Sequence, residues 1–236
     1  YNYPLAESGI PFIFMNAAGS LRDVETMVHE SGHAMHAFLS DDLPLNAFKN
    51  VPMEVAEVAS MSMELISMEG WDAFLTDPSE LKRAKIEQLE GVISTLPWIA
   101  TIDAYQHWLY TNPQHTNAER TEKWIEIARR FDTNVADITG YEKYYANSWQ
   151  KQLHLYEVPF YYIEYGFAQL GAIAIWRDVL KDKQKGLDAY KNMLSLGYTK
   201  TIPELFKAGN IEFNFTPAYV GELFDFVWAE LQKLKQ

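Results

Sequence analysis

The chain has 236 residues, of which 48% are hydrophobic and 14% aromatic, a composition typical of a folded globular protein. Its 32 acidic and 20 basic residues give a formal net charge of −12. Such a charge repels phosphate backbones and anionic membrane surfaces, so we expect neither a nucleic acid nor a membrane as partner. The sequence has no cysteine, which excludes disulfides and thiolate ligands, so any metal must be held by His, Asp or Glu.

The ends of the chain predict that it is part of a longer protein. It begins with Tyr1, and the first residues have neither the basic region nor the cleavage site of a signal peptide. The apolar stretch 166–176 is about half the ~20 residues that a membrane span needs. We therefore expect a single domain over residues 1–236, which is part of a cytoplasmic protein.

In chain order, the sequence predicts one strand followed by helices. The apolar segment 10–16, IPFIFMN, indicates a strand at a sheet edge. Ser20 with Asp23 three positions on is typical of a helix start. Hydrophobic periodicity and turn residues then predict helices at 20–39, 52–68, 79–110, 117–131, 142–152, 159–181, 185–196, 202–208 and 218–234. The expected fold is mainly α, with a small β element near the N-terminal end.

The stretch VHESGHAMH, residues 28–36, lies inside the first of these helices. His29 and His33 are four residues apart, so they lie on one helix face and can bind one cation. Glu30 lies about 100° around the helix from His29, where it can hold a water bound to that cation. A solvent-exposed pair of histidines is the alternative interpretation. We interpret His36 as a hydrogen-bonded residue at the edge of the cleft, because a third ligand at that spacing is sterically awkward.

The next helix offers the missing third ligand. Glu57, Ser60 and Glu64 form a polar stripe on an otherwise apolar helix. Buried carboxylates are costly unless they are paired or bind a metal, so this stripe is expected to face the histidines. Spacing alone leaves open whether Glu54, Glu57 or Glu64 completes a His2Glu zinc site, with another glutamate orienting a histidine.

At this point the residues resemble the M3 family of zinc metallopeptidases, and most closely its oligoendopeptidase F branch. The resemblance covers nearly the whole chain and is carried by PFIFMNAAG, DVETMVHESGHAMHAFLS, VPMEVAEVASMSMEL and HLYEVPFYYIEYGFAQLGA. It implies a zincin-like helical catalytic domain, the C-terminal part of a longer chain, with one Zn2+ per chain. The residues that match the family's zinc ligands are His29, His33 and Glu57. Glu30 matches the catalytic base, and Glu64 matches a glutamate that supports the site.

The resemblance also implies residues that contact the substrate and the oxyanion. They match His154, Tyr162 and Tyr165, with a one-residue shift between the histidine and the tyrosines. Tyr161 is the alternative if the shift falls elsewhere. From composition alone, these tyrosines would be interpreted as aromatic core.

The expected function is hydrolysis of peptide bonds in short peptides by a zinc-activated water, with Glu30 as the base. Extended substrate is expected to add to the edge strand around residues 14–17. A zinc carboxypeptidase or dipeptidyl carboxypeptidase, a structural zinc module, and a catalytically incomplete zinc-binding fragment are the alternatives. The expected partners are short peptides and a missing N-terminal portion that forms the other wall of the cleft.

Overall fold

The computed structural model describes residues 1–5 and 7–236. The described chain forms two compact units, which are treated separately below. Unit 1 comprises residues 1–92 and 167–236, and unit 2 comprises residues 93–166. The expectation of one catalytic domain over residues 1–236 stays a prediction.

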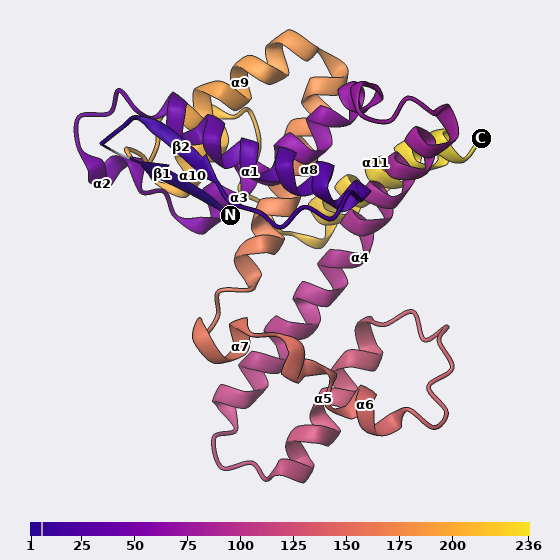
Figure 1. Cartoon of the computed structure of the whole chain (residues 1–236). Helices are drawn as coiled ribbons and strands as arrows, with labels where there is room; N and C mark the ends of the chain where they lie inside the picture. The colour runs from indigo at the N-terminus through magenta and orange to yellow at the C-terminus, as the bar shows by residue number, and fades with distance from the viewer. Residues whose placement is uncertain (6) are drawn as a thin grey trace. The chain divides into compact units, whose positions relative to one another are not determined.

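The structure is mainly α-helical with a small β element near the N-terminal end, so the predicted fold class is confirmed (Figure 1). The elements of unit 1 are β1 (Asn2–Leu5), β2 (Ile10–Ile13), α1 (Leu21–Leu39), α2 (Asn46–Lys49), α3 (Met53–Ser67), the 3-10 helix η1 (Met68–Ala73), α9 (Lys183–Ser195), α10 (Ile202–Ala208) and α11 (Pro217–Lys235). Unit 2 contains α5 (Asn117–Phe131), α6 (Glu142–Ala146), the 3-10 helix η2 (Ser148–Lys151) and α7 (His154–Glu157). The boundaries between the units fall within α4 (Pro78–Thr111) and α8 (Ile163–Lys181).

The β element is an antiparallel hairpin in which Asn2 lies opposite Ile13. The sequence predicted a strand to residue 16, but β2 ends at Ile13. The amide of Phe14 still donates to the carbonyl of Tyr1 at 3.0 Å, and residues 15–17 have no partner strand in the described chain. The sequence predicted that substrate would add to a strand around residues 14–17, but these residues do not form a strand.

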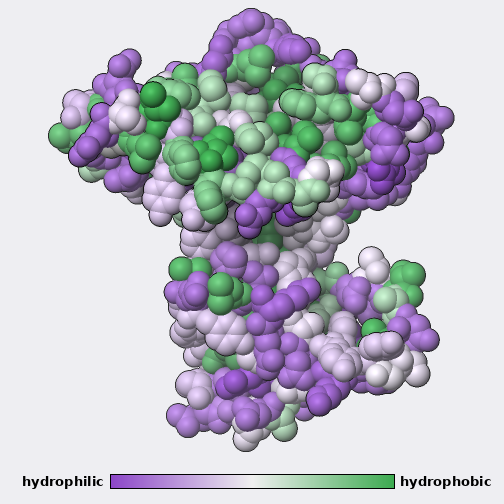
Figure 2. Space-filling model, viewed as in Figure 1, coloured by the Kyte–Doolittle hydropathy of each residue, from purple (hydrophilic) through white to green (hydrophobic). Residues whose placement is uncertain are grey.

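Large hydrophobic side chains are exposed on the hairpin and on α1. They gather on the face of unit 1 that these elements form (Figure 2). The exposed residues are Tyr3, Leu5, Ile10, Phe12, Phe14, Met27 and Phe38. A contiguous apolar surface of this kind is typical of a face that contacts another molecule or segment.

Two of the predicted helices have different bounds in the structure. The expected helix 142–152 ends at Ala146, because the side-chain amide of Asn147 donates to the carbonyl of Lys143 at 2.8 Å and competes with the helical pattern. The expected helix 159–181 begins only at Ile163. Phe160 has φ = 62°, which is incompatible with a right-handed helix.

The packing of α1 on α3 determines where the site residues lie. The backbone amide of Ser20 donates to Oδ2 of Asp23 at 2.8 Å, which fixes the start of α1 as predicted. Gly32 then lies directly against α3, since a β-carbon there would be 2.6 Å from both the Ala59 carbonyl oxygen and the Ser60 α-carbon. Tyr190 of α9 donates its hydroxyl to the same Ala59 carbonyl at 2.7 Å. The close approach at Gly32 sets the distance between α3 and the histidine helix, and the Tyr190 hydrogen bond joins α3 to α9.

Substitution of Gly32 by alanine is expected to destabilise the protein, although alanine favours helices by ~0.5–1 kcal/mol over glycine. The atoms in the way belong to the α3 backbone and cannot move aside as a side-chain end can. Overpacking of this kind typically costs ~1–3 kcal/mol, so the steric cost exceeds the gain in propensity. Chemical denaturation measures the difference.

Gly221→Ala is the matched control, because Gly221 is also helical, in α11, and an added β-carbon would meet nothing within 4 Å. It is expected to be neutral or stabilising. A Gly32→Ala variant as stable as the unsubstituted protein would contradict the close approach of α1 and α3.

Candidate metal centre

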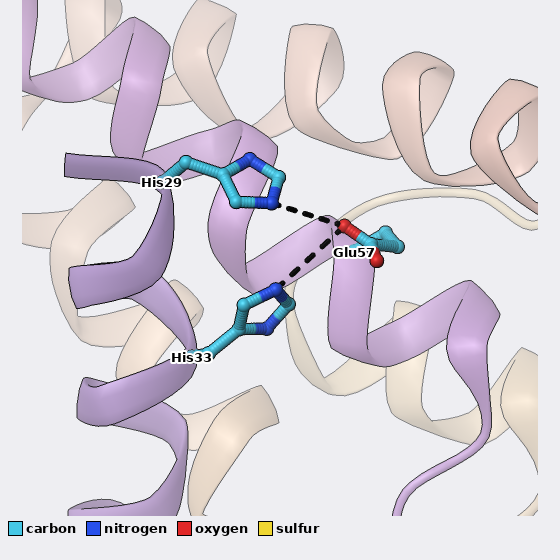
Figure 3. A group of neighbouring side chains, drawn as sticks. All are labelled: His29, His33 and Glu57. Carbon is cyan, nitrogen blue, oxygen red and sulfur yellow. Dashed lines mark ion pairs between the residues drawn. The ribbon is translucent and has the colours of Figure 1, made fainter. Parts of the chain in front are cut away.

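Three potential ligands from two helices meet in unit 1. His29 and His33 extend from α1 toward Glu57 of α3 (Figure 3). One ligand atom from each of the three lies within 4.8 Å of the other two. Oε2 of Glu57 is 3.5 Å from Nε2 of His29 and 3.8 Å from Nε2 of His33.

These distances suit a single zinc ion. Zinc binds imidazole nitrogen and carboxylate oxygen at ~2.0–2.2 Å with tetrahedral geometry, which separates two ligand atoms by about 3.4 Å. The two distances to Glu57 are close to that value. A His2Glu set also leaves one tetrahedral position for water or substrate, as catalytic zinc sites do. The residues present therefore fit the metal that the sequence predicts.

A second carboxylate fixes the ring of His29. Oε1 of Glu64 is 2.6 Å from Nδ1 of His29. Since an ionised carboxylate only accepts hydrogen bonds, Nδ1 donates in this pair, and in the neutral ring the lone pair of Nε2 points toward Glu57. Gln88 of α4 donates to the other oxygen of Glu64 at 2.8 Å. This arrangement is typical of the outer shell of metal sites.

The acceptor oxygen of Glu57 is itself held in place. Oγ of Ser60, one turn further along α3, donates to Oε2 of Glu57 at 2.9 Å. Both side chains are buried, with exposed fractions of 6% for Glu57 and 0% for Ser60. The polar stripe that the sequence identified on this helix thus faces α1. Gln88 gave no signal in the sequence, because only the tertiary fold brings α4 to Glu64.

The two histidines differ in their electrostatic surroundings. Burial lowers the pKa of His33 to about 4, against the smaller opposing effect of the Glu57 charge. Burial also acts to lower the pKa of His29, but the hydrogen bond to Glu64 and the surrounding carboxylates outweigh it and raise that pKa above its ordinary value. His33 is therefore a neutral imidazole near pH 7, the form that binds a metal.

The sequence left open which of three glutamates is the third metal ligand, and the three occupy different positions in the structure. Glu57 is part of the group of potential ligands, and Glu64 contacts the far nitrogen of His29. Glu54, in the first turn of α3, is not part of the group found among residues 1–5 and 7–236. Of the three glutamates, only Glu57 belongs to the group of potential ligands found among the described residues, and its assignment as the third ligand stays a prediction.

Glu30 and His36 are both buried beside this group. Glu30 is 8% exposed, and its Oε2 atom has no hydrogen-bond partner within the described part of the chain. Its Oε1 atom is 3.2 Å from the amino nitrogen of Tyr1. His36 is 4% exposed, burial lowers its pKa to about 4, and its Nε2 likewise has no partner among the described residues. The sequence expected a hydrogen-bonded His36 at the edge of a cleft, and this stays a prediction.

The residues expected to contact substrate form a separate cluster in unit 2. The ring of His154 lies 4.9 Å from that of Tyr162 and 5.7 Å from those of Tyr161 and Tyr165. The three tyrosines thus surround one histidine, and the structure does not choose between Tyr161 and Tyr162. The potential metal ligands belong to unit 1. Joint action of the two clusters on one substrate stays a prediction.

The fold and the site define a class of mainly helical proteins in which an HExxH helix and a glutamate of the following long helix bring together potential metal ligands. The family model that matches this chain is that of peptidase family M3, over residues 2–223. The chain belongs to that family.

Relatives in the family carry related names. The chain is 25% identical to the oligoendopeptidase F homolog of Borreliella burgdorferi over 82% of its length, and 25% identical to oligopeptidase PepF of Bacillus subtilis over 84%. It covers 33% and 30% of those two proteins. A solved structure provisionally assigned as an oligoendopeptidase F matches 98% of the chain with a TM-score of 0.86 and 28% identity, and the chain covers 41% of it. The predicted family and branch are confirmed.

The chain therefore spans about a third of the length of the curated relatives that it matches.

Among the described residues, no helix is both long enough and apolar enough to cross a membrane.

Proposed function

We propose that this chain carries the zinc-dependent catalytic centre of an oligoendopeptidase, which hydrolyses internal peptide bonds of short peptides. The observation that carries the proposal is the convergence of His29, His33 and Glu57, with Glu30 buried next to the first of them. Membership of peptidase family M3 and the names of the relatives support the same activity.

Nε2 of His29, Nε2 of His33 and Oε2 of Glu57 would hold the zinc. A bound zinc ion lowers the pKa of a coordinated water to about 7 and polarises a carbonyl. Glu30 takes up a proton on its carboxylate as the water attacks the substrate carbonyl carbon, and then delivers this proton to the nitrogen of the leaving amine. The unsatisfied Oε2 atom of Glu30 supports this role, since a water there would be its hydrogen-bond partner.

The surrounding residues keep the ligands oriented. Glu64, itself held by Gln88, accepts the Nδ1 proton of His29 and keeps Nε2 available. The hydroxyl of Ser60 donates to Oε2 of Glu57 and holds that carboxylate in place. Such outer contacts typically change metal affinity or activity 10–100-fold when they are removed.

The aromatic cluster of unit 2 would provide the contacts to the substrate. In this proposal, the hydroxyl of Tyr162 or Tyr165 donates to the oxygen that becomes negatively charged, and His154 hydrogen-bonds to the substrate. One donor of this kind typically contributes ~10²–10³ in rate. The clustering of these rings around His154 supports a shared role.

An assay with a quenched fluorescent peptide blocked at both ends tests the function. The 236-residue chain is expected to cleave internal bonds of this peptide, to lose activity when a chelator removes the metal, and to regain it with one zinc per chain. Cleavage only of peptides with a free C-terminus would indicate a carboxypeptidase instead. Turnover that is unaffected by complete metal removal would contradict the proposed zinc centre.

A further inference from the structure

A chain of hydrogen bonds leads to His154 from inside unit 2. Trp98 lies on α4, and its indole Nε1 donates to Oε1 of Gln152 at 3.0 Å. Nε2 of the same Gln152 side chain is 2.7 Å from Nδ1 of His154. Nε2 of His154 is in turn 3.5 Å from the hydroxyl oxygen of Tyr165. All four residues belong to unit 2.

The indole of Trp98 determines the directions of the other hydrogen bonds in this series. An indole N–H can donate but cannot accept, so the Gln152 atom that faces Trp98 is the carbonyl oxygen. The hydroxyl of Tyr162 also hydrogen-bonds with both side chains, but a hydroxyl can donate as well as accept, so it does not by itself fix the orientation of the Gln152 amide. The amide nitrogen of Gln152 then faces His154, and an amide nitrogen also only donates. Nδ1 of His154 must therefore accept, which leaves the ring hydrogen on Nε2.

The surroundings of His154 favour the neutral ring that this scheme needs. Burial lowers the pKa of His154, with a smaller opposing effect from Glu157. With its hydrogen on Nε2, the ring donates toward Tyr165, and the phenol oxygen is the acceptor in that contact.

We propose that Trp98 and Gln152 are positioning residues, which hold His154 in the tautomer with its hydrogen on Nε2 and so make it a donor toward Tyr165 and toward substrate. The part of the proposal that concerns substrate rests on the proposed peptidase function. The tautomer itself does not, because it follows from contacts within unit 2. Neither Trp98 nor Gln152 belongs to the motifs of the zinc site.

A purely structural role for these residues makes a different prediction. Trp98 packs against the buried cluster of Ile102, Tyr105, Trp124, Ala128 and Trp149, and its ring lies 5.9 Å from that of Trp124. If packing were its only role, losing the indole N–H would leave the histidine tautomer unchanged. The tautomer is thus the readout that separates positioning from packing.

Long-range proton–nitrogen NMR correlations of the histidine rings measure the tautomer directly, at a pH where His154 is neutral. A His154→Gln variant assigns its signals among the six histidines. In the unsubstituted chain, we expect the hydrogen of His154 on Nε2. Gln152→Glu should move it to Nδ1, because a carboxylate accepts from both Trp98 and His154. Trp98→Phe should populate both tautomers, since the amide of Gln152 can then rotate.

Trp124→Phe is the matched control. It removes an indole N–H from the same cluster, but this N–H donates to the Tyr145 carbonyl and to Ser148 instead. The control should leave the tautomer of His154 unchanged. A His154 that keeps its hydrogen on Nε2 in the folded Gln152→Glu variant would overturn the proposal. Circular dichroism establishes that each variant is folded, and no readout depends on zinc or peptide turnover, so failure here is distinguishable from failure of the proposed function.

Discussion

Replacement of Glu30 by glutamine is expected to lower peptide turnover by about 10²–10⁴-fold while one zinc per chain stays bound. Glutamine has the shape of glutamate, so the buried position, which is 8% exposed, stays filled. Its amide cannot take up a proton near neutral pH and so cannot act as the base. The three potential ligands are unchanged, and metal content should therefore not fall. Turnover of the blocked peptide and the zinc stoichiometry of the same preparation measure both effects.

The matched control for this substitution is Glu54→Gln. Glu54 is also a helical glutamate of unit 1, on α3, and it lies outside the group of potential ligands. Its variant should retain the turnover of the unsubstituted chain. Near-normal turnover in Glu30→Gln would exclude this glutamate as the base, whereas loss of zinc in that variant would show that Glu30 supports the metal instead.

Local sequence rules predicted most helices, because the contacts that start and end these helices join residues only a few positions apart. The helix at Asn117–Phe131 has the predicted bounds, and its Thr116 cap is satisfied by Glu119 three residues on. The same chemistry at Ser20 and Asp23 fixed the start of α1. Hydrophobic periodicity and caps suffice where one helix face is buried and its ends are satisfied locally.

The sequence did not reveal the breaks near the substrate cluster. Phe160 adopts a left-handed conformation that bulky residues rarely adopt, so nothing in its residue type indicates it. Asn147 is compatible with a helix interior as well as with a cap. At both places the surrounding tertiary structure, rather than the local propensity, determines where the helix ends.

The residues of the candidate metal centre divide in the same way. His29, His33 and Glu30 could be selected as candidates from the sequence, because the spacing of helical residues fixes their relative directions. Glu57 needed a second kind of reasoning, the cost of a carboxylate on a buried helix, and this left three glutamates open. Contacts such as that of Gln88 with Glu64 join residues 24 positions apart, and no local pattern predicts them.

Replacement of Glu57 by alanine is expected to weaken zinc binding by more than 100-fold, because two histidines alone would remain of the three potential ligands. The loss should exceed that of Glu64→Gln, for which a 10–100-fold decrease is expected, since Glu64 acts on the metal only through Nδ1 of His29. Competition with a chromophoric chelator measures both affinities, and circular dichroism establishes that the variants are folded.

The order of these two losses distinguishes the ligand from its support. Both glutamates lie on α3 and both contact His29, so simple disturbance of this helix would weaken zinc binding to a similar extent in either variant. Only a direct ligand at Glu57 predicts the larger effect there, because its Oε2 atom lies near Nε2 of both histidines. Tight zinc binding in Glu57→Ala, together with its loss in Glu64→Gln, would reverse the assignment and make Glu64 the third ligand.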